Sequence, residues 1–241
     1  MTQIIGRPGR YSRTQGNANS RRAWAWKLLA WPAGAVSVLY LVLGGLSYVE
    51  HRGGVAELLA GAVFGWVWLA GARKSASAQT HATRQQHGTG AEEEVVAALQ
   101  AAGVTLVING AELHAGGDAD HVVAHLRGDG TGVLAVVETK AGGGTIRMAG
   151  RTILSGKAGR AIPGDPIAQA LRQADALTRM THRQAVAVVC IPWMTNEPFA
   201  AFGAIVCGKR HLHQLFSRTL PATRLDARDL QMIQTSVRPK S

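Results

Sequence analysis

Acidic residues and a lysine lie at the ends of two apolar runs in the stretch "DADHVVAHLRGDGTGVLAVVETK", residues 118–140. Such runs are typical of strands that bury hydrocarbon, so charged residues at their ends need a reason. Residues two apart on a strand share a face, and Glu138 and Lys140 should therefore project together. Asp120 lies in the first run, and its position relative to Glu138 depends on the turn between the two strands.

Two kinds of turn lead to opposite arrangements. A strict two-residue turn at 129–130 would place Asp120 opposite Thr139, facing away from Glu138. A connection with an odd number of residues, such as 128–130, would place Asp120 opposite Glu138 on the same face. We expect the odd connection, because it brings the two carboxylates together.

Two carboxylates held side by side repel each other unless a cation lies between them. Carboxylate and backbone carbonyl oxygens suit Mg²⁺ or Mn²⁺, which share their coordination with water and substrate phosphate. Lys140 could then orient and help deprotonate an attacking water, or offset charge on a phosphorane-like transition state. The alternative is a solvated salt bridge between Lys140 and Glu138 or Asp120 at a wet strand end.

A further acid comes from the segment "AEEEVVAALQAAG", which is predicted to form an amphipathic helix. Glu92 precedes Val95 and Val96 by three and four positions, so it shares their buried face and could reach a metal-bound water. Its alternative role is to offset the helix macrodipole. His121, beside Asp120, is expected to be a core histidine that hydrogen-bonds its neighbours or supports a metal ligand, and not to be a ligand itself.

The surrounding elements indicate a mixed α/β domain from residue 88 onward. Apolar periodicity and turn residues predict helices near 91–103, 165–179, 209–217 and 226–234, and strands near 104–109, 119–127, 132–140, 185–193 and 202–208. A second hairpin should turn at Ala149 and Gly150. The last two strands are uninterrupted apolar runs, which is typical of strands covered on both faces.

Four ordered blocks, "GTGAEEEVVAALQAAGV", "GGDADHVV", "VLAVVETKA" and "PIAQALRQADAL", resemble the nuclease-related domain, NERD. The resemblance covers roughly residues 88–208. That family is placed in the PD-(D/E)XK nuclease superfamily, and the resemblance implies a restriction-endonuclease-like mixed sheet flanked by helices.

The same resemblance implies a role for each matching residue. Asp120 and Glu138 would be metal ligands, assisted by the backbone carbonyl of Thr139. The catalytic group would comprise Lys140 as the catalytic lysine, Glu92 as the helix acid, and Gln169 as the polar residue that opens the later helix. Because the first block has three glutamates in a row, Glu93 is the alternative helix acid, and Gln169 could instead bond the backbone near its helix start.

The net charge of +11 is concentrated in the N-terminal third of the chain. Residues 1–84 hold ten Lys and Arg against two acids, whereas residues 85–241 hold sixteen against thirteen. The basic balance is therefore weak evidence for nucleic-acid binding by the α/β domain. Cys190 and Cys207 lie in apolar runs without metal-ligand spacing, as expected of core cysteines in a reducing compartment.

Residues 28–72 are predicted to form a transmembrane helical hairpin. The span 28–49 has no charge, and 53–72 carries only Glu57, near its start. At about 1.5 Å per residue, each run is long enough for a hydrocarbon core of about 30 Å. Tryptophans near one end would form an interfacial belt: Trp24, Trp26, Trp31, Trp66 and Trp68. The soluble alternative is a buried helical hairpin.

Charges flanking the hairpin predict its orientation. Basic residues gather before the first span and after the second, whereas the connection has only Arg52. By the positive-inside rule both termini, and the domain at 88–241, are cytoplasmic at the cell (plasma) membrane. We expect residues 1–27 to be a basic, disordered arm near anionic lipid, and residues 73–87 to be a polar linker.

The sequence thus predicts a membrane-anchored nuclease that uses Mg²⁺ or Mn²⁺ to hydrolyse phosphodiester bonds, with DNA as the expected substrate. Four basic residues of the second hairpin would contact backbone phosphates, or else form an ordinary exposed hairpin: Arg147, Arg151, Lys157 and Arg160. The alternative function is a non-catalytic, membrane-tethered nucleic-acid-binding or sensing module with the same fold.

Overall fold

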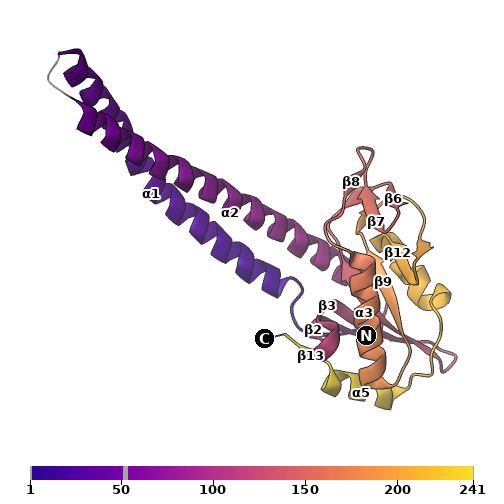
Figure 1. The fold of residues 1–241 in the computed structure, drawn as a ribbon. Coiled ribbons are helices and arrows are strands. Elements are labelled where there is room, and N and C mark those ends of the chain that lie inside the picture. The colour runs from indigo at the N-terminus through magenta and orange to yellow at the C-terminus, as the bar shows by residue number, and fades with distance from the viewer. Residues whose placement is uncertain (1, 51–53, 241) are drawn as a thin grey trace. The chain divides into compact units, whose positions relative to one another are not determined.

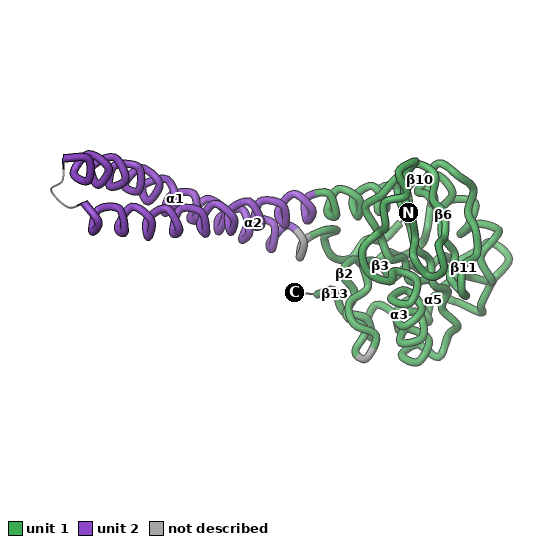
Figure 2. Tube along the Cα trace, turned by 45° about the horizontal axis from the view of Figure 1, so that its top comes forward, with its two compact units in different colours: residues 1–11, 87–241 green, residues 12–86 purple. Residues whose placement is uncertain are grey.

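The computed structural model describes residues 2–50 and 54–240. Arg52, one of the charges that predict the orientation of the hairpin, lies outside them. The chain forms two compact units, which Figure 2 colours separately. Residues 12–86 make the helical unit, and residues 1–11 together with 87–241 make the α/β unit.

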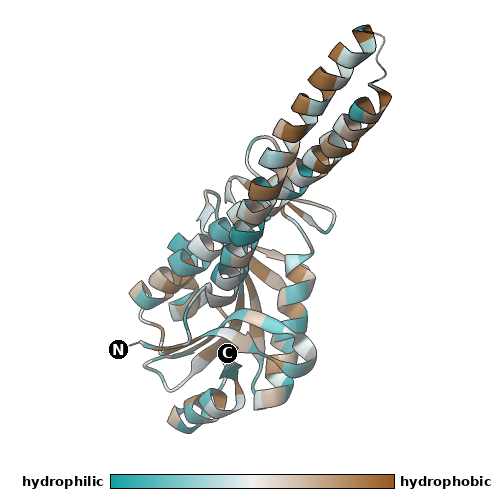
Figure 3. Cartoon of the chain, turned by 90° about the vertical axis from the view of Figure 1, so that its left-hand side faces the viewer, coloured by the Kyte–Doolittle hydropathy of each residue, from teal (hydrophilic) through white to brown (hydrophobic). Residues whose placement is uncertain are grey.

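Two long helices form the helical unit, α1 (Arg10–Val49) and α2 (Val55–Ala101), and α2 continues into the α/β unit. Both are long and apolar enough to cross a membrane by length and composition. Only 17% and 11% of their most apolar windows are buried, and Trp31 and Trp66 are exposed. The buried soluble hairpin is therefore not what the structure shows, and Figure 3 colours these stretches largely brown.

Small residues let α1 and α2 pack closely. Buried small residues recur every seven positions along α1, at Gly16, Ala23, Ala30, Ser37 and Gly44. A seven-residue period corresponds to 3.5 residues per turn and keeps the row on the side that faces α2. The Ser37 hydroxyl donates to the Gly61 carbonyl at 2.7 Å, and that of Ser75 donates to the Ala23 carbonyl at 3.1 Å.

The segment 73–87, predicted as a polar linker, is instead part of α2. It contains no Pro or Gly and is rich in Ala, Arg and Gln, which are strong helix formers. Ser75 and Ala82 are buried within it, so the segment also has tertiary partners. Polarity alone suggested a linker, but nothing in the segment breaks a helix.

The N-terminal arm also differs from the predicted disorder. Strand β1 (Gln3–Ile5) pairs in parallel with β2 (Leu106–Glu112), and α1 begins soon afterwards. The exposed edge of β2 offers backbone partners that a three-residue strand lacks by itself. The α/β unit therefore includes residues from both ends of the described chain.

The α/β unit is built on an eight-stranded mixed sheet in the order β1-β2-β3-β4-β9-β12-β11, with β13 also pairing with β2. Strands β4, β9 and β12 are parallel to one another, and β2, β3 and β4 are antiparallel neighbours. The remaining strands are β3 (Asp118–Leu126), β4 (Gly132–Thr139), β9 (Ala185–Cys190), β11 (Phe199–Ala201), β12 (Ala204–Cys207) and β13 (Arg238–Pro239).

Helices cover both faces of this sheet. Leu134 of β4 lies in one core cluster with Leu177 of α3 (Pro166–Thr181), which crosses the sheet in Figure 1. The next residue, Ala135, lies in the other cluster with Leu99 of α2. All of β4 is buried as a result. The predicted α/β class, with a mixed sheet flanked by helices and an apolar hairpin before it, is confirmed and is consistent with a nuclease-like fold.

Shorter elements complete the unit. A small sheet of β6, β7 and β8 contains the predicted hairpin, which turns after Ala149. Cys190 and Cys207 are buried and free, as predicted. The short elements are η1 (His114–Gly116), β5 (Gly143–Gly144), β6 (Ile146–Ala149), β7 (Thr152–Ser155), β8 (Arg160–Ala161), β10 (Trp193–Met194), η2 (Lys209–His211), α4 (Leu212–Gln214), η3 (Leu215–Thr219) and α5 (Ala227–Ser236).

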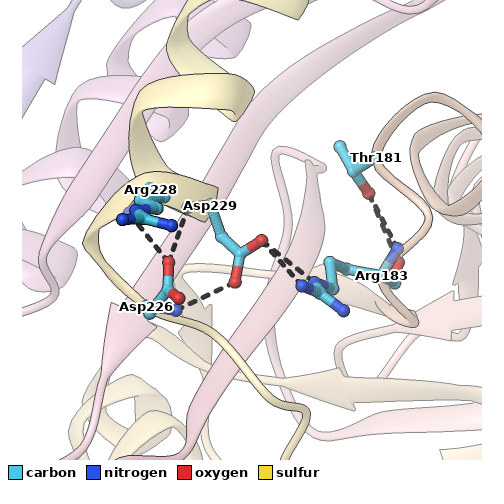
Figure 4. Close-up of polar contacts among 5 residues, drawn as sticks. All are labelled: Thr181, Arg183, Asp226, Arg228 and Asp229. Atoms are coloured by element: carbon cyan, nitrogen blue, oxygen red, sulfur yellow. Dashed lines mark hydrogen bonds and ion pairs between the residues drawn. The ribbon is translucent and has the colours of Figure 1, made fainter.

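A charged network fastens α5 to the turn after α3 (Figure 4). Asp226 caps α5, and the Asp229 carboxylate accepts from the Asp226 backbone N–H in return, which makes a capping box. Arg183 donates from Nε and a terminal nitrogen to Asp229 Oδ1, each at 3.0 Å. Asp229 is buried, so it depends on these partners.

Asp229→Ala is predicted to destabilise the protein by about 2–3 kcal/mol, because it removes a charge-assisted hydrogen bond and half of a capping box. Asp175→Ala is the matched control, since the Asp175–Arg179 pair is exposed and one helical turn apart. It should cost no more than about 0.5 kcal/mol. Thermal unfolding in detergent measures both, and equal losses would contradict the assigned role of Asp229.

Candidate active site

The β3–β4 register brings the two predicted carboxylates together. His121 pairs with Val137, and the next step of the register places Asp120 opposite Glu138. The strands end at Leu126 and resume at Gly132, so five residues connect them, an odd number. The odd connection is confirmed, and the two-residue turn is wrong.

Glu138 is a fully buried acid that Lys140 pairs with. Its side chain is 1% exposed, and its Oε1 accepts from Lys140 Nζ at 2.6 Å. Its second oxygen, Oε2, is buried without a hydrogen-bond partner in the described chain. The salt bridge between Lys140 and Glu138 was the alternative to a metal site, and it is present. However, that alternative expected a solvated bridge at a wet strand end, and a fully buried carboxylate does not fit it.

The side chain of Asp120 is hydrogen-bonded to the main chain of the residue after Glu138. The backbone N–H of Thr139 donates to Asp120 Oδ2 at 2.7 Å. Burial raises the pKa of Asp120 well above its usual value, and the charges of Glu138 and Glu92 raise it further. Lys140 and the Thr139 N–H act in the opposite direction. The site therefore holds more negative charge than its own cations offset.

The pKa values of Glu138 and Lys140 are raised as well. Burial raises the pKa of Glu138, although Lys140 and Gln173 oppose the shift. For Lys140, burial favours the neutral form, but Glu138, Asp120 and Glu92 outweigh burial and raise its pKa. Lys140 is therefore a protonated cation at neutral pH, beside carboxylates that would take up more positive charge.

These groups fit a hard divalent cation through oxygen ligands. No group of three or more His, Cys, Asp or Glu side chains in the described residues could by itself hold a metal. Two carboxylates with a backbone carbonyl and water are the type of donor set that Mg²⁺ accepts. The orphaned Oε2 of Glu138 and the raised pKa values of Asp120 and Glu138 support that fit.

Glu92 approaches the group from α2. It is half-buried, and its charge raises the pKa values of both Asp120 and Lys140. The backbone N–H of Gly9 donates to Glu92 Oε2 at 2.7 Å. The N-terminal segment thus holds the carboxylate that the sequence placed near the site. Glu94, two residues along, pairs instead with Lys209 at 2.5 Å.

The sequence missed Gln173, which lies on α3 one turn after the predicted Gln169. Gln173 is buried, lowers the pKa of Glu138, and donates from Nε2 to the Asp118 carbonyl at 2.6 Å. Gln169 is half-buried, and its backbone N–H bonds to the Asp165 carbonyl in the first turn. The spacing of four shared by the two glutamines was the available signal, because such residues share a helix face.

His121 has the predicted core role. Its Nδ1 lies 2.8 Å from Asn109 Oδ1, and its Nε2 lies 3.2 Å from Thr139 Oγ1. Burial lowers the pKa of His121 to about 3, so the ring is neutral at neutral pH. Asn109 also donates to the Gly6 carbonyl at 3.2 Å, which links this network to the N-terminal segment.

The four predicted phosphate-contacting residues are all exposed and lie in or next to the small β6-β7-β8 sheet. They are Arg147, Arg151, Lys157 and Arg160. The Arg151 guanidinium lies 5.7 Å from the ring centre of Phe202. Exposure agrees with either of their two predicted roles.

Raised carboxyl pKa values predict a specific pH dependence. A carboxyl group whose pKa is raised on folding stabilises the folded protein fully at a pH below its usual pKa, which is 3.8 for Asp120 and 4.5 for Glu138. That stabilisation is lost as the pH rises through the pKa of the folded state. Asp120→Asn should therefore stabilise the metal-free protein, and more so at neutral than at mildly acidic pH. Thermal unfolding with a chelator tests this.

Asp129→Asn is the matched control on the same hairpin. Hydrogen bonds from Thr131 lower the pKa of Asp129, so loss of the Asp129 carboxylate should reduce stability at a pH above its usual pKa of 3.8.

Added Mg²⁺ should raise the unfolding midpoint of the wild type, most at neutral pH, and hardly raise that of Asp120→Asn. An Asp120→Asn protein that is less stable than wild type in chelator at neutral pH would refute the crowded pair.

The hydrogen bond from Gly9 to Glu92 holds Gly9 in a position where any side chain should destabilise the protein. Gly9 has φ +65°, and an added Cβ would lie 2.4 Å from Thr89 Cγ2. Gly9→Ala should cost at least about 1 kcal/mol of stability. Gly88→Ala, in α2 with open space around it, should instead stabilise by about 0.5–1 kcal/mol. Unfolding midpoints that shift alike would argue against a docked N-terminal segment.

Comparison with known proteins identifies the domain that carries this site. Residues 87–194, which include Glu92, Asp120, Glu138 and Lys140, match the family model described as the nuclease-related domain, NERD. No curated protein and no solved structure matches the chain. The order of the four sequence blocks and the matched range agree. The part of the chain that holds the acids and Lys140 is therefore similar to the nuclease-related domain.

Proposed function

We propose that this protein is a membrane-anchored, metal-dependent nuclease that hydrolyses phosphodiester bonds of DNA on the cytoplasmic side of the cell membrane. One observation carries the proposal: in a nuclease-related domain, Asp120 and the buried Glu138 are adjacent, with raised pKa values and with Lys140 on Glu138. A structural salt bridge needs one acid, whereas this site gathers three around one lysine.

In this proposal Asp120, Glu138 and the Thr139 carbonyl hold Mg²⁺ or Mn²⁺. The bound cation would supply a Lewis acid and lower the pKa of its water. Lys140, whose own pKa is raised, serves better as a cation that offsets charge on the phosphoryl oxygens than as a base in the metal-free state.

The other proposed groups position the site. Glu92, held by the Gly9 N–H, reaches the attacking water from the side. Gln169 is proposed as the polar residue at the start of α3. Gln173, on the same helix face, lowers the pKa of Glu138 and donates to the Asp118 carbonyl. Full burial of Gln173 and partial burial of Glu92 and Gln169 limit their motion before substrate binds, and electrostatic stabilisation requires such fixed groups.

DNA is the proposed substrate because exposed cations lie on the small sheet of the same domain. Arg147, Arg151, Lys157 and Arg160 are proposed to contact phosphates without reading bases.

The hairpin is the proposed anchor, through spans within residues 28–72. Lys74 Nζ lies 4.6 Å from the ring centre of Trp26, so a basic residue and an interfacial aromatic meet at one end of the hairpin. Basic residues before α1's apolar stretch and after that of α2 support the proposed topology, in which both termini are cytoplasmic.

Lys140→Ala in the full chain is predicted to lose Mg²⁺-dependent cleavage by about 100-fold or more, because charge stabilisation in the transition state is removed. Lys209→Ala is the matched control: Lys209 pairs with Glu94 on the surface, and its loss should leave turnover nearly unchanged. Cleavage of single-stranded, duplex and branched DNA, and of RNA, with chelator controls measures the effect.

The outcome also separates the proposal from a binding module. Equal cleavage by wild type and Lys140→Ala would remove the assigned site. Calorimetry that detects no Mg²⁺ or Mn²⁺ binding dependent on Asp120 and Glu138, together with retained DNA binding, would indicate a non-catalytic membrane-tethered module.

A further inference from the structure

Two large apolar side chains stand out on the surface of the described α/β unit. Trp193 is 43% exposed and Phe202 is 56% exposed. Trp193 lies on β10, which pairs with Gly143 and Gly144 just after Lys140. Phe202 lies at the tip of the β11–β12 hairpin. An exposed aromatic costs solubility and contributes little to the fold, so Phe202 needs another explanation.

The backbone at Phe202 makes that explanation more pressing. Ala201 pairs with Ala204, so Phe202 and Gly203 form a two-residue turn with φ +52° and +93°. Such a turn favours Asn-Gly, and a bulky residue with positive φ is strained. Strain that persists at an exposed tip is typical of a functional position.

Phe202 also has a cationic neighbour from a separate hairpin. Arg151, in the β6–β7 turn, places its guanidinium 5.7 Å from the centre of the Phe202 ring. Arg151 is itself exposed and lies over one face of the Phe202 ring, so the two side chains form a cationic and aromatic patch on the surface. Arg147 and Arg160 lie on the strands of the same small sheet.

We infer that Phe202 and Arg151 form a stacking site for an unpaired base, so that the substrate class is single-stranded nucleic acid or a strand with unpaired ends. This inference rests on the proposed nuclease function, because it names the substrate class of the same domain. The ring takes the face of a base, and Arg151 takes the adjoining phosphate.

Single-stranded nucleic acid fits this surface better than a duplex does. Aromatic platforms combined with basic grooves bind single strands, because each base exposes a π-face for stacking. A duplex hides those faces and needs cations alone. Here Arg151 adjoins an aromatic side chain that the turn holds outward at a conformational cost, and binding of a duplex would not use that side chain.

Phe202→Asn tests the inference with a variant that should fold better than wild type. Asn is favoured in the left-handed conformation of this turn, so the unfolding midpoint should rise. In chelator, fluorescence anisotropy of the full chain in detergent should show weaker binding of labelled oligothymidylate by roughly 5- to 150-fold, the range for loss of one stacked base. Binding of a duplex of equal length should hardly change, and Phe202→Trp should retain wild-type affinity for oligothymidylate.

The arms of the experiment separate the stacking site from the nuclease function. Oligothymidylate binding that is unchanged in Phe202→Asn would overturn the stacking site, even if wild type cleaves DNA. Wild type that cleaves nothing would overturn the nuclease, yet a selective loss of oligothymidylate binding would still support stacking. A loss of binding to anionic lipid vesicles, with oligothymidylate binding intact, would reassign Phe202 to the membrane surface.

Discussion

Repulsion between Asp120 and Glu138 is the constraint on which the site depends. The β3–β4 register sets the two carboxylates opposite each other. Burial raises the pKa values of both, and the charge of Glu138 raises that of Asp120 further. Lys140 and the Thr139 N–H offset only part of the charge. A strand pair would relax this repulsion by slipping, but a one-residue slip would turn every buried side chain to the wrong face. The apolar core thus holds the acids together.

Packing on both faces of the sheet opposes such a slip of the strands. Leu134 packs toward α3 and Ala135 toward α2, so β4 cannot shift without opening two cores at once. The same two helices deliver the polar groups that surround the pair. Gln173 comes from α3, and Glu92 comes from α2. Packing and chemistry therefore use the same elements, which explains why Glu138 lies near the end of the fully buried strand β4.

The sequence was sufficient where local rules decide. Alternation and the odd connection predicted that Asp120 meets Glu138, and the run of apolar residues predicted strands covered on both faces. The sequence was insufficient where the structure of a segment depends on a partner that is distant in the chain. Residues 73–87 looked like a linker, although the buried small residues spaced by seven along α1 show the surface against which this part of α2 packs. Gln173 could be distinguished from Gln169 only once the position of Glu138 beneath α3 was known.

Strand β1 shows most clearly why the matched domain is not the folding unit. The family model covers 87–194, yet β1 and β13 pair with β2 from outside that range, and β12 with β11 completes the other side of the sheet. Gly9, in the same N-terminal segment, fixes the Glu92 carboxylate. Because Coulomb energy falls with distance, the position of that carboxylate sets how strongly it acts on Asp120 and Lys140. The charge balance of the site thus depends on residues that precede the helical hairpin in the chain.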